Sequence, residues 1–171
     1  MPAAQSEVSS AATRERTPAI HLRPFILGDE AAFRALNEAW LGKYVAIEAS
    51  DRLLLDNPVA NILEPGGHIF MALYDDRPVG CCALLRMGPR EFELAKMAVL
   101  EEERGRGIGR KVLKYAIVRA KLLGAKRLYL ETNSKLANAI RLYESVGFHH
   151  VPREQVIPRH TIANVFMTME L

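Results

Sequence analysis

The segment "RGRGIGRK", residues 104–111, restricts the possible folds of this chain more than any other stretch. Its three glycines and four basic side chains lie between an apolar run at 91–100 and a helical apolar pattern that begins at Ile108. Glycines at this density let backbone N–H groups approach a ligand closely, and a helix N-terminus favours an anion. The segment therefore predicts a strand, an anion-binding loop and a helix, in that order.

The hydrophobic pattern around this loop predicts an α+β domain. Apolar runs at 68–74, 78–87 and 91–100 are separated by turn-forming residues, which indicates an antiparallel meander. A first strand is predicted at 20–27, and the later strands at 126–132, 148–152 and 163–171. Helices are predicted after Asp29, after a Ser50 cap, at 108–123 and at 133–146. The layout has one βαβ unit in its second half.

Composition excludes several classes of protein. The 171 residues are 49% hydrophobic and carry a net charge of +3, which fits one globular domain and requires no nucleic acid. No apolar run is long enough to span a membrane. Residues 1–17 lack the apolar stretch of a signal peptide and predict a disordered tail before a domain at 18–171. Cys81 and Cys82 are neighbours that should point to opposite faces of a strand, so we expect no disulfide between them. No metal-ligand spacing such as C-x-x-C is present and the histidines are scattered, so no metal site is expected. This use of cysteine fits a cytoplasmic location.

Two other anion-binding motifs resemble the glycine segment less well. A P-loop needs Gly before Lys111 and Ser or Thr after it, where this chain has Arg110 and Val112. A dinucleotide-binding fingerprint needs its glycines directly after the strand, and here Glu-Glu-Glu-Arg intervenes. A plain turn into a helix needs only one glycine, and the basic residues at the helix start would oppose the macrodipole unless an anion were bound.

The segment resembles the acetyl-CoA loop of the GCN5-related N-acetyltransferase (GNAT) superfamily, in which the pattern is [RQ]-x-x-G-x-[GA]. A second segment, "ETNSKLANAIRLYESVGF" at 131–148, is similar to that family's A-x-x-L-Y-x-x-x-G-F motif. The resemblance extends over residues 20–171. It implies a mostly antiparallel, splayed sheet of about seven strands with about four helices, and a habit of forming homodimers.

The same resemblance implies that acetyl-CoA is the co-substrate. The expected cofactor-binding residues are Met97, Ala98, Val99, Arg104, Gly105, Arg106, Gly107, Ile108, Gly109, Arg110, Asn133, Asn138 and Tyr143. The first three would pair with the pantetheine amides through their backbone, and residues 104–110 would hold the pyrophosphate. One departure is Leu136, where the family often has Asn; Asn133 and Asn138 lie nearby and are the expected substitutes.

The resemblance also implies the catalytic groups. Tyr143 is the expected acid for the leaving thiolate, because a phenol is protonated at neutral pH. The general base is left open between Glu93 and Glu131, with Glu93 slightly favoured, and ordered water is a further alternative.

The expected reaction is direct acetyl transfer to a primary amine of a small-molecule or amino-acid-like acceptor. A protein N-terminal or lysine acetyltransferase and a non-catalytic acetyl-CoA sensor are the alternatives. The residues proposed near the acceptor are Trp40, Tyr44, Glu48, Asp51, Arg153, Arg159 and His160.

Overall fold

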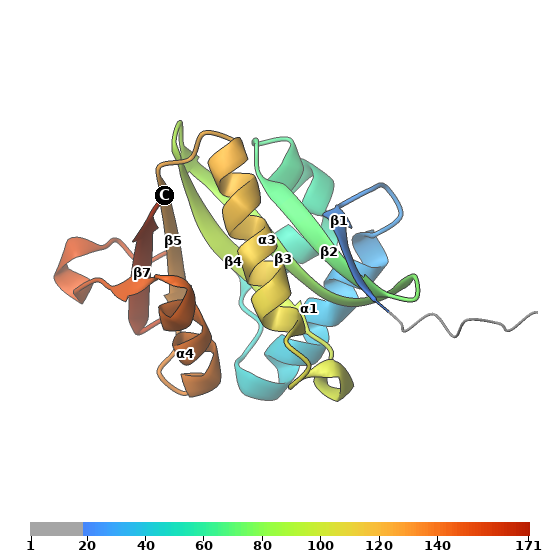
Figure 1. Ribbon diagram of the computed structural model, residues 1–171. Helices are drawn as coiled ribbons and strands as arrows, with labels where there is room; N and C mark the ends of the chain where they lie inside the picture. Colours follow the sequence, from blue (N-terminus) through green and yellow to red (C-terminus); the bar gives the residue numbers. More distant parts are fainter. Residues whose placement is uncertain (1–18) are drawn as a thin grey trace, which may run out of the picture.

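The computed structural model describes residues 19–171 and contains a seven-stranded sheet with helices on both faces (Figure 1). The expected tail at 1–17 lies outside the described residues. The strands are β1 (Ile20–Pro24), β2 (His68–Tyr74), β3 (Arg77–Gly88), β4 (Glu91–Val99), β5 (Arg127–Thr132), β6 (His149–His150) and β7 (Val165–Glu170). The α-helices are α1 (Glu30–Tyr44), α2 (Ala49–Asp56), α3 (Ile108–Leu122) and α4 (Ala137–Val146), with short helical turns at Val59–Leu63, Glu101–Glu103 and Arg153–Gln155.

The sheet has the order β1-β2-β3-β4-β5-β7-β6, and only β4 and β5 run parallel. The predicted antiparallel meander is β2-β3-β4, and the predicted βαβ unit is β4-α3-β5. Both predictions are confirmed, as are the α+β class and the strand number.

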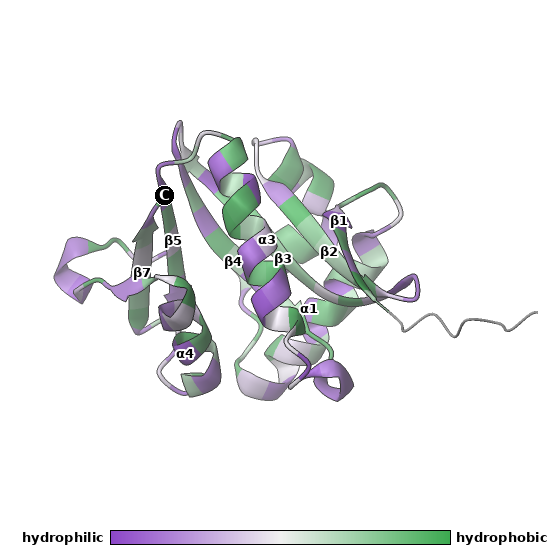
Figure 2. Cartoon of the chain, in the orientation of Figure 1, coloured by the Kyte–Doolittle hydropathy of each residue, from purple (hydrophilic) through white to green (hydrophobic). Residues whose placement is uncertain are grey.

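Strand alternation divides the core into two clusters, one on each face of the sheet. Cys82 and Leu84 pack with the buried side of α3, whereas Cys81 and Ala83 pack with α1 and α2. In Figure 2, green apolar residues run along the central strands and recur along α3. Both cysteines are free and buried, so the prediction that they form no disulfide with each other is confirmed.

One predicted helix start, after Asp29, is confirmed, and two others differ from the structure. Asp29 is the N-terminal residue before α1, but its carboxylate accepts hydrogen bonds from Arg23 and the Ile26 N–H instead of capping the helix. The cap of α2 is Glu48 rather than Ser50, because Glu48 and Asp51 form a reciprocal capping box. The predicted helix at 133–146 begins only at Ala137.

The sheet opens between β4 and β5. These strands pair from Glu91 to Glu93 against Arg127–Tyr129, and their pairing ends there. On its other edge β4 contains a bulge, since two residues, Lys96 and Met97, oppose the single residue Cys82 of β3. A bulge bends its strand locally, and this one lies just beyond Glu93, where the pairing with β5 stops.

Lys96 holds this bulge in an unusual backbone conformation. Its φ is +51°, in the left-handed region that non-glycine residues rarely adopt. Its ammonium group pairs with the carboxylate of Asp51 in α2, and the two side chains are only 6% and 5% exposed. Asp51 also accepts a hydrogen bond from the Glu48 N–H at 2.8 Å. The pair therefore connects the bulge of β4 to the first turn of α2.

We predict that Lys96→Met lowers the free energy of unfolding by about 3–5 kcal/mol, because it leaves the Asp51 charge buried without a partner. Urea denaturation measures this loss. The double variant Lys96→Met/Asp51→Asn should recover a large part of it, since no buried charge then remains. Lys43→Met is the control, because the Lys43–Glu101 pair is largely exposed and its loss should have little effect. Equal effects of the two single variants would contradict the importance of the buried pair.

Candidate active site

Two of the three glycines in segment 104–111 are required by the backbone. Gly105 and Gly107 have φ values of +75° and +76°, and Gly107 is the residue from which α3 begins. Gly109 has an ordinary helical conformation, and a Cβ there would lie 3.5 Å from Leu142 and Met97. The backbone conformation thus requires two glycines, whereas a plain turn into a helix would need only one.

The loop presents a row of free donors. The backbone N–H groups from Gly105 to Arg110 have no hydrogen-bond partner among the described residues. The start of α3 has no side-chain cap and no acidic residue in its first turn. Most helix starts are capped by such a side chain, so these uncapped donors form a ready anion-binding site.

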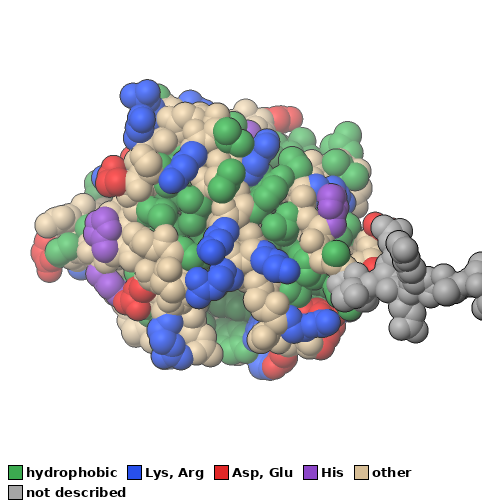
Figure 3. All heavy atoms as spheres, in the orientation of Figure 1, with side chains coloured by type: hydrophobic (Ala, Val, Ile, Leu, Met, Phe, Trp, Pro, Cys, Tyr) green, Lys and Arg blue, Asp and Glu red, His purple; other side chains and the backbone are tan. Residues whose placement is uncertain are grey.

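The arginines of the loop differ in their contacts. Arg104 donates to the Tyr44 hydroxyl at 2.6 Å and to the Val99 carbonyl at 3.3 Å. Arg106 donates to Glu103 at 2.5 Å, and its guanidinium lies 5.0 Å from the ring centre of Tyr74. Both side chains fasten the loop to neighbouring elements. In Figure 3, Lys and Arg side chains gather on the face that carries α3, beside a hollow next to α4.

A groove extends from this loop along the opening in the sheet. Its lining includes the predicted cofactor residues Met97, Ala98, Val99, Arg104, Gly105, Gly107, Ile108, Gly109, Arg110, Asn138 and Tyr143. Beyond Glu93 the edge of β4 that faces β5 has no strand partner among the described residues. The structure therefore brings most of the predicted cofactor-binding residues into one groove.

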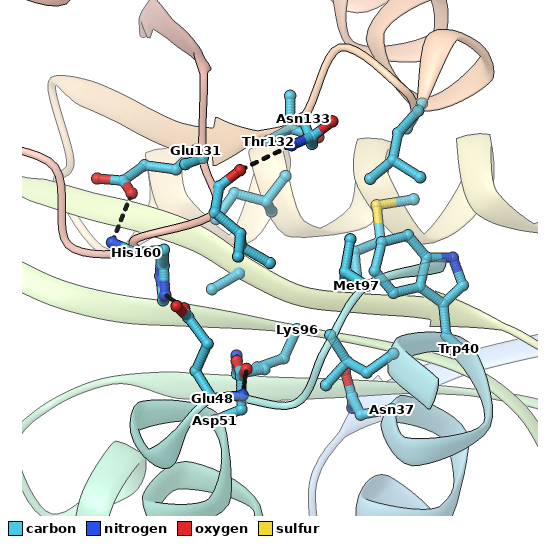
Figure 4. A pocket seen from close by; sticks show the side chains of 18 of the residues that line it. Asn37, Trp40, Glu48, Asp51, Lys96, Met97, Glu131, Thr132, Asn133 and His160 are labelled. Atoms are coloured by element: carbon cyan, nitrogen blue, oxygen red, sulfur yellow. Dashed lines mark hydrogen bonds and ion pairs between the residues drawn. The ribbon is translucent and has the colours of Figure 1, made fainter. Parts of the chain in front are cut away.

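A second cavity meets the groove on the far side of the opening (Figure 4). The two share five lining residues, namely Trp40, Met97, Leu136, Ala139 and Tyr143. The second cavity, which we call the acceptor pocket, also contains Glu48, Asp51, Glu93, Lys96, Glu131 and His160. In Figure 4 the acidic and histidine side chains occupy one side, and Met97 and Trp40 occupy the other.

Tyr143 lies where the two cavities join. Its ring packs edge to face against Phe148, with ring centres 6.0 Å apart. Burial raises the pKa of Tyr143 to about 12, and nearby Cys82 acts in the same direction. The phenol is thus held in its protonated form at neutral pH, in which it can donate a proton.

Glu93 is 1% exposed and forms contacts with the segment between β6 and β7. Its Oε1 lies 3.1 Å from Nε2 of His160, and its Oε2 lies 3.0 Å from Nη1 of Arg159. The Arg159 contact is an ion pair without hydrogen-bond alignment, so Oε2 accepts no hydrogen bond. The hydrogen bond from His160 to Glu93 raises the pKa of the imidazole, against the lowering effect of burial.

Glu131 accepts hydrogen bonds at both carboxylate oxygens. It accepts from the Arg159 N–H at 2.8 Å, from the His160 N–H at 2.9 Å and from the Tyr129 hydroxyl at 3.0 Å. These three donors come from the protein itself. The carboxylate that was one of the two candidate bases therefore fixes the backbone of residues 159–160.

Four of the residues predicted near the acceptor line one or both of the cavities. Trp40, Glu48 and Asp51 line the acceptor pocket, and Tyr44 lines the groove. Asn133 donates to the Ile162 carbonyl at 2.7 Å and so holds the turn before α4.

Arg153 is directed elsewhere, since it stacks on Phe166 and is absent from both linings. Sequence reasoning missed Lys96, although a lone basic residue inside an apolar strand was a visible signal.

Comparison with known proteins identifies the family. The sequence profile of the acetyltransferase (GNAT) family matches residues 30–148. The chain belongs to the acetyltransferase (GNAT) family. The uncharacterized N-acetyltransferase YjgM of Escherichia coli K12 is 34% identical over 111 residues. The match covers 63% of this chain and 66% of YjgM, slightly under two thirds of that relative.

Solved GNAT structures share the fold. A GNAT acetyltransferase from Staphylococcus aureus Mu50 superposes with a TM-score of 0.81 at 24% identity, over 89% of this chain and 99% of that one. A GNAT acetyltransferase from Elizabethkingia anophelis, solved with acetyl-CoA bound, has a TM-score of 0.61 at 23% identity, over 89% and 98%. The expected GNAT fold is confirmed.

Two further observations concern residues 19–171 of this GNAT protein. Within them, no three His, Cys, Asp or Glu side chains are grouped so as to hold a metal ion. None of the helices in the same range is long and apolar enough to cross a membrane.

We predict that Gly107→Ala destabilises the protein by about 1–2 kcal/mol, because alanine at a left-handed position pays a conformational cost. No neighbouring atom lies within 4 Å of the added Cβ, so a clash contributes nothing. Gly42→Ala is the matched control: its Cβ also meets nothing within 4 Å, but Gly42 lies in α1 without a positive φ. That change should stabilise the protein. Thermal unfolding compares the two, and a stabilising Gly107→Ala would contradict the assigned conformation.

Proposed function

We propose that this chain is an acetyl-CoA-dependent N-acetyltransferase that transfers an acetyl group to the primary amine of a small-molecule or amino-acid-like acceptor. The observation that carries the proposal is the row of unpartnered N–H groups from Gly105 to Arg110. These donors, at a helix N-terminus with basic neighbours, suit the pyrophosphate of coenzyme A. The unpaired edge of β4 suits the pantetheine amides, which would bind it as an added strand through Met97, Ala98 and Val99.

The contact between groove and pocket supports direct transfer in a ternary complex. Bound acetyl-CoA supplies an activated acetyl thioester. Met97 and Tyr143 line both cavities, so an amine in the acceptor pocket can approach a thioester in the groove without a covalent enzyme intermediate. Tyr143, with its raised pKa, gives its proton to the departing sulfur.

The acceptor pocket favours a cationic ligand. Four carboxylates and two basic side chains line it, and Lys96 is already paired with Asp51. A protonated amine is therefore attracted by the pocket. His160, Ile162 and Ala163 also line the pocket, and this wall from the segment between β6 and β7 favours a small acceptor over a protein chain.

The contacts of the two candidate bases also bear on the proposal. Both oxygens of Glu131 accept hydrogen bonds, from three donors in total, whereas Glu93 has an oxygen that accepts no hydrogen bond. This difference favours Glu93 as the carboxylate that takes part in proton removal.

Two measurements test the proposed function. Acetyl-CoA should raise the melting temperature, whereas ATP and NADH should not. A panel of small amines, amino acids and peptides, assayed for acetyl-CoA-dependent thiol release, should then identify a small amine as acceptor. Preference for peptides would favour a protein acetyltransferase. Tight acetyl-CoA binding with no turnover on any acceptor would favour a sensor.

We predict that Tyr143→Phe lowers kcat by about 10²- to 10⁴-fold, because the sulfur then leaves without its proton donor. Acetyl-CoA binding should be nearly unchanged, since phenylalanine keeps the ring and its packing. Tyr115→Phe is the control. Tyr115 lies on α3, packs against Phe70 of β2 and lines neither cavity. Steady-state kinetics measure both variants, and an unchanged kcat in Tyr143→Phe would remove the tyrosine from the mechanism.

A further inference from the structure

Three carboxylates from three separate elements converge on residues 159–161. Glu131 of β5 accepts the N–H groups of Arg159 and His160. Glu93 of β4 contacts the side chains of the same two residues. Glu48, which caps α2, accepts the hydroxyl of Thr161. Carboxylates of β5, β4 and the start of α2 thus hold the segment at the acceptor pocket and position the His160 ring.

The imidazole of His160 lies between two carboxylates. Its Nε2 is 3.1 Å from Glu93 Oε1, and its Nδ1 is 3.9 Å from Glu48 Oε2. An ionised carboxylate can only accept a hydrogen bond, so Nε2 carries the hydrogen that points to Glu93. In the neutral ring, Nδ1 then keeps its lone pair. The side chain is 17% exposed and lines the acceptor pocket, so the imidazole can be reached from there.

We propose that His160, rather than Glu93 directly, accepts the proton of the acceptor ammonium, with Glu93 orienting the ring. This inference rests on the proposed N-acetyltransferase function. The side chain of His160 is 17% exposed and that of Glu93 only 1%, so an amine in the pocket can reach the imidazole more readily than the carboxylate. Glu131 is a positioning residue, because it fixes the backbone that carries the ring. The arrangement follows the logic of a carboxylate–histidine pair in which the carboxylate sets the tautomer.

The proton balance of the step is complete. One N–H bond of the acceptor ammonium breaks, and its proton moves to Nδ1 of His160. The freed lone pair forms the C–N bond as the thioester C–S bond breaks. Tyr143 protonates the sulfur, and the second nitrogen proton restores the Tyr143 hydroxyl through solvent. His160 finally releases its proton to solvent, so the reaction yields one proton overall.

The charges around the ring set the pH dependence. The groups that face His160 from the surrounding elements are Glu93 and Lys96 of β4, Glu48 and Asp51 at the start of α2, Glu131 of β5 and the adjacent Arg159. The Glu93 hydrogen bond dominates and raises the pKa of His160 above its ordinary value of 6.5, while Lys96 lowers it. Only the neutral ring accepts a proton, so activity should increase as the pH rises through this raised pKa.

The test is the pH dependence of kcat/KM between pH 6 and 9.5, with the best amine from the acceptor panel. Wild-type protein should show an ionisation with an apparent pKa above 6.5, in addition to the ionisation of the amine itself, which is titrated separately and subtracted. His160→Gln keeps a polar side chain but cannot accept a proton, so kcat/KM at pH 8 should fall about 10²-fold and that ionisation should disappear. The control is His150→Gln, since His150 pairs with Glu144 on the exposed surface outside both cavities. It should behave like wild type.

Further variants separate chemistry from structure. Glu131→Gln should lower kcat/KM but keep the ionisation, because it loosens the segment without removing the imidazole. Acetyl-CoA should raise the melting temperature of His160→Gln as much as that of wild type, which shows an intact fold.

The outcomes also separate the inference from the proposed function. An active His160→Gln that retains the ionisation would overturn the role of His160 and leave the N-acetyltransferase function in place. If the wild type itself acetylates no amine, the proposed function fails and the role of His160 fails with it.

Discussion

The loss of pairing between β4 and β5 after Glu93 is the constraint on which the rest of the structure depends. If the two strands stayed paired, their backbone groups would satisfy each other and the sheet would have no opening. Because they separate, β4 keeps an unpaired edge, and the groove and the acceptor pocket meet between the strands. The bulge at Lys96 and Met97 bends β4 at this level, and the Lys96–Asp51 pair fixes the bulge to α2.

The same pair connects the two halves of the site. Met97 lines both cavities and follows Lys96 directly, while Asp51 and Glu48 belong to the acceptor side. A change in α2 can therefore reach the strand that faces the groove through this buried ion pair, in addition to the apolar cluster that α2 and β4 share. Such a connection makes the geometry of the acceptor pocket depend on that of the groove.

Local patterns predicted the features that are determined locally. Alternation along β3 placed Cys81 and Cys82 on opposite faces, and the glycine segment marked the free N–H groups before α3, because both depend on neighbours in sequence. Tyr143 was proposed through its motif, and its role remains a prediction. By contrast, the engagement of Glu131 and the position of His160 depend on contacts between residues 28 or more positions apart. No local pattern encodes such contacts, so the sequence left the choice between the two glutamates open and favoured Glu93 only slightly.

The contacts of Arg104 and Arg106 have a consequence for the affinity of the loop. Since Tyr44, Val99 and Glu103 already hold these side chains, the loop loses its conformational entropy when the protein folds and not when a ligand arrives. When an anion binds, the main entropy loss is then that of the ligand and not that of the loop. Ordering the loop therefore lowers the free energy of unfolding, and in return it raises the affinity for an anion.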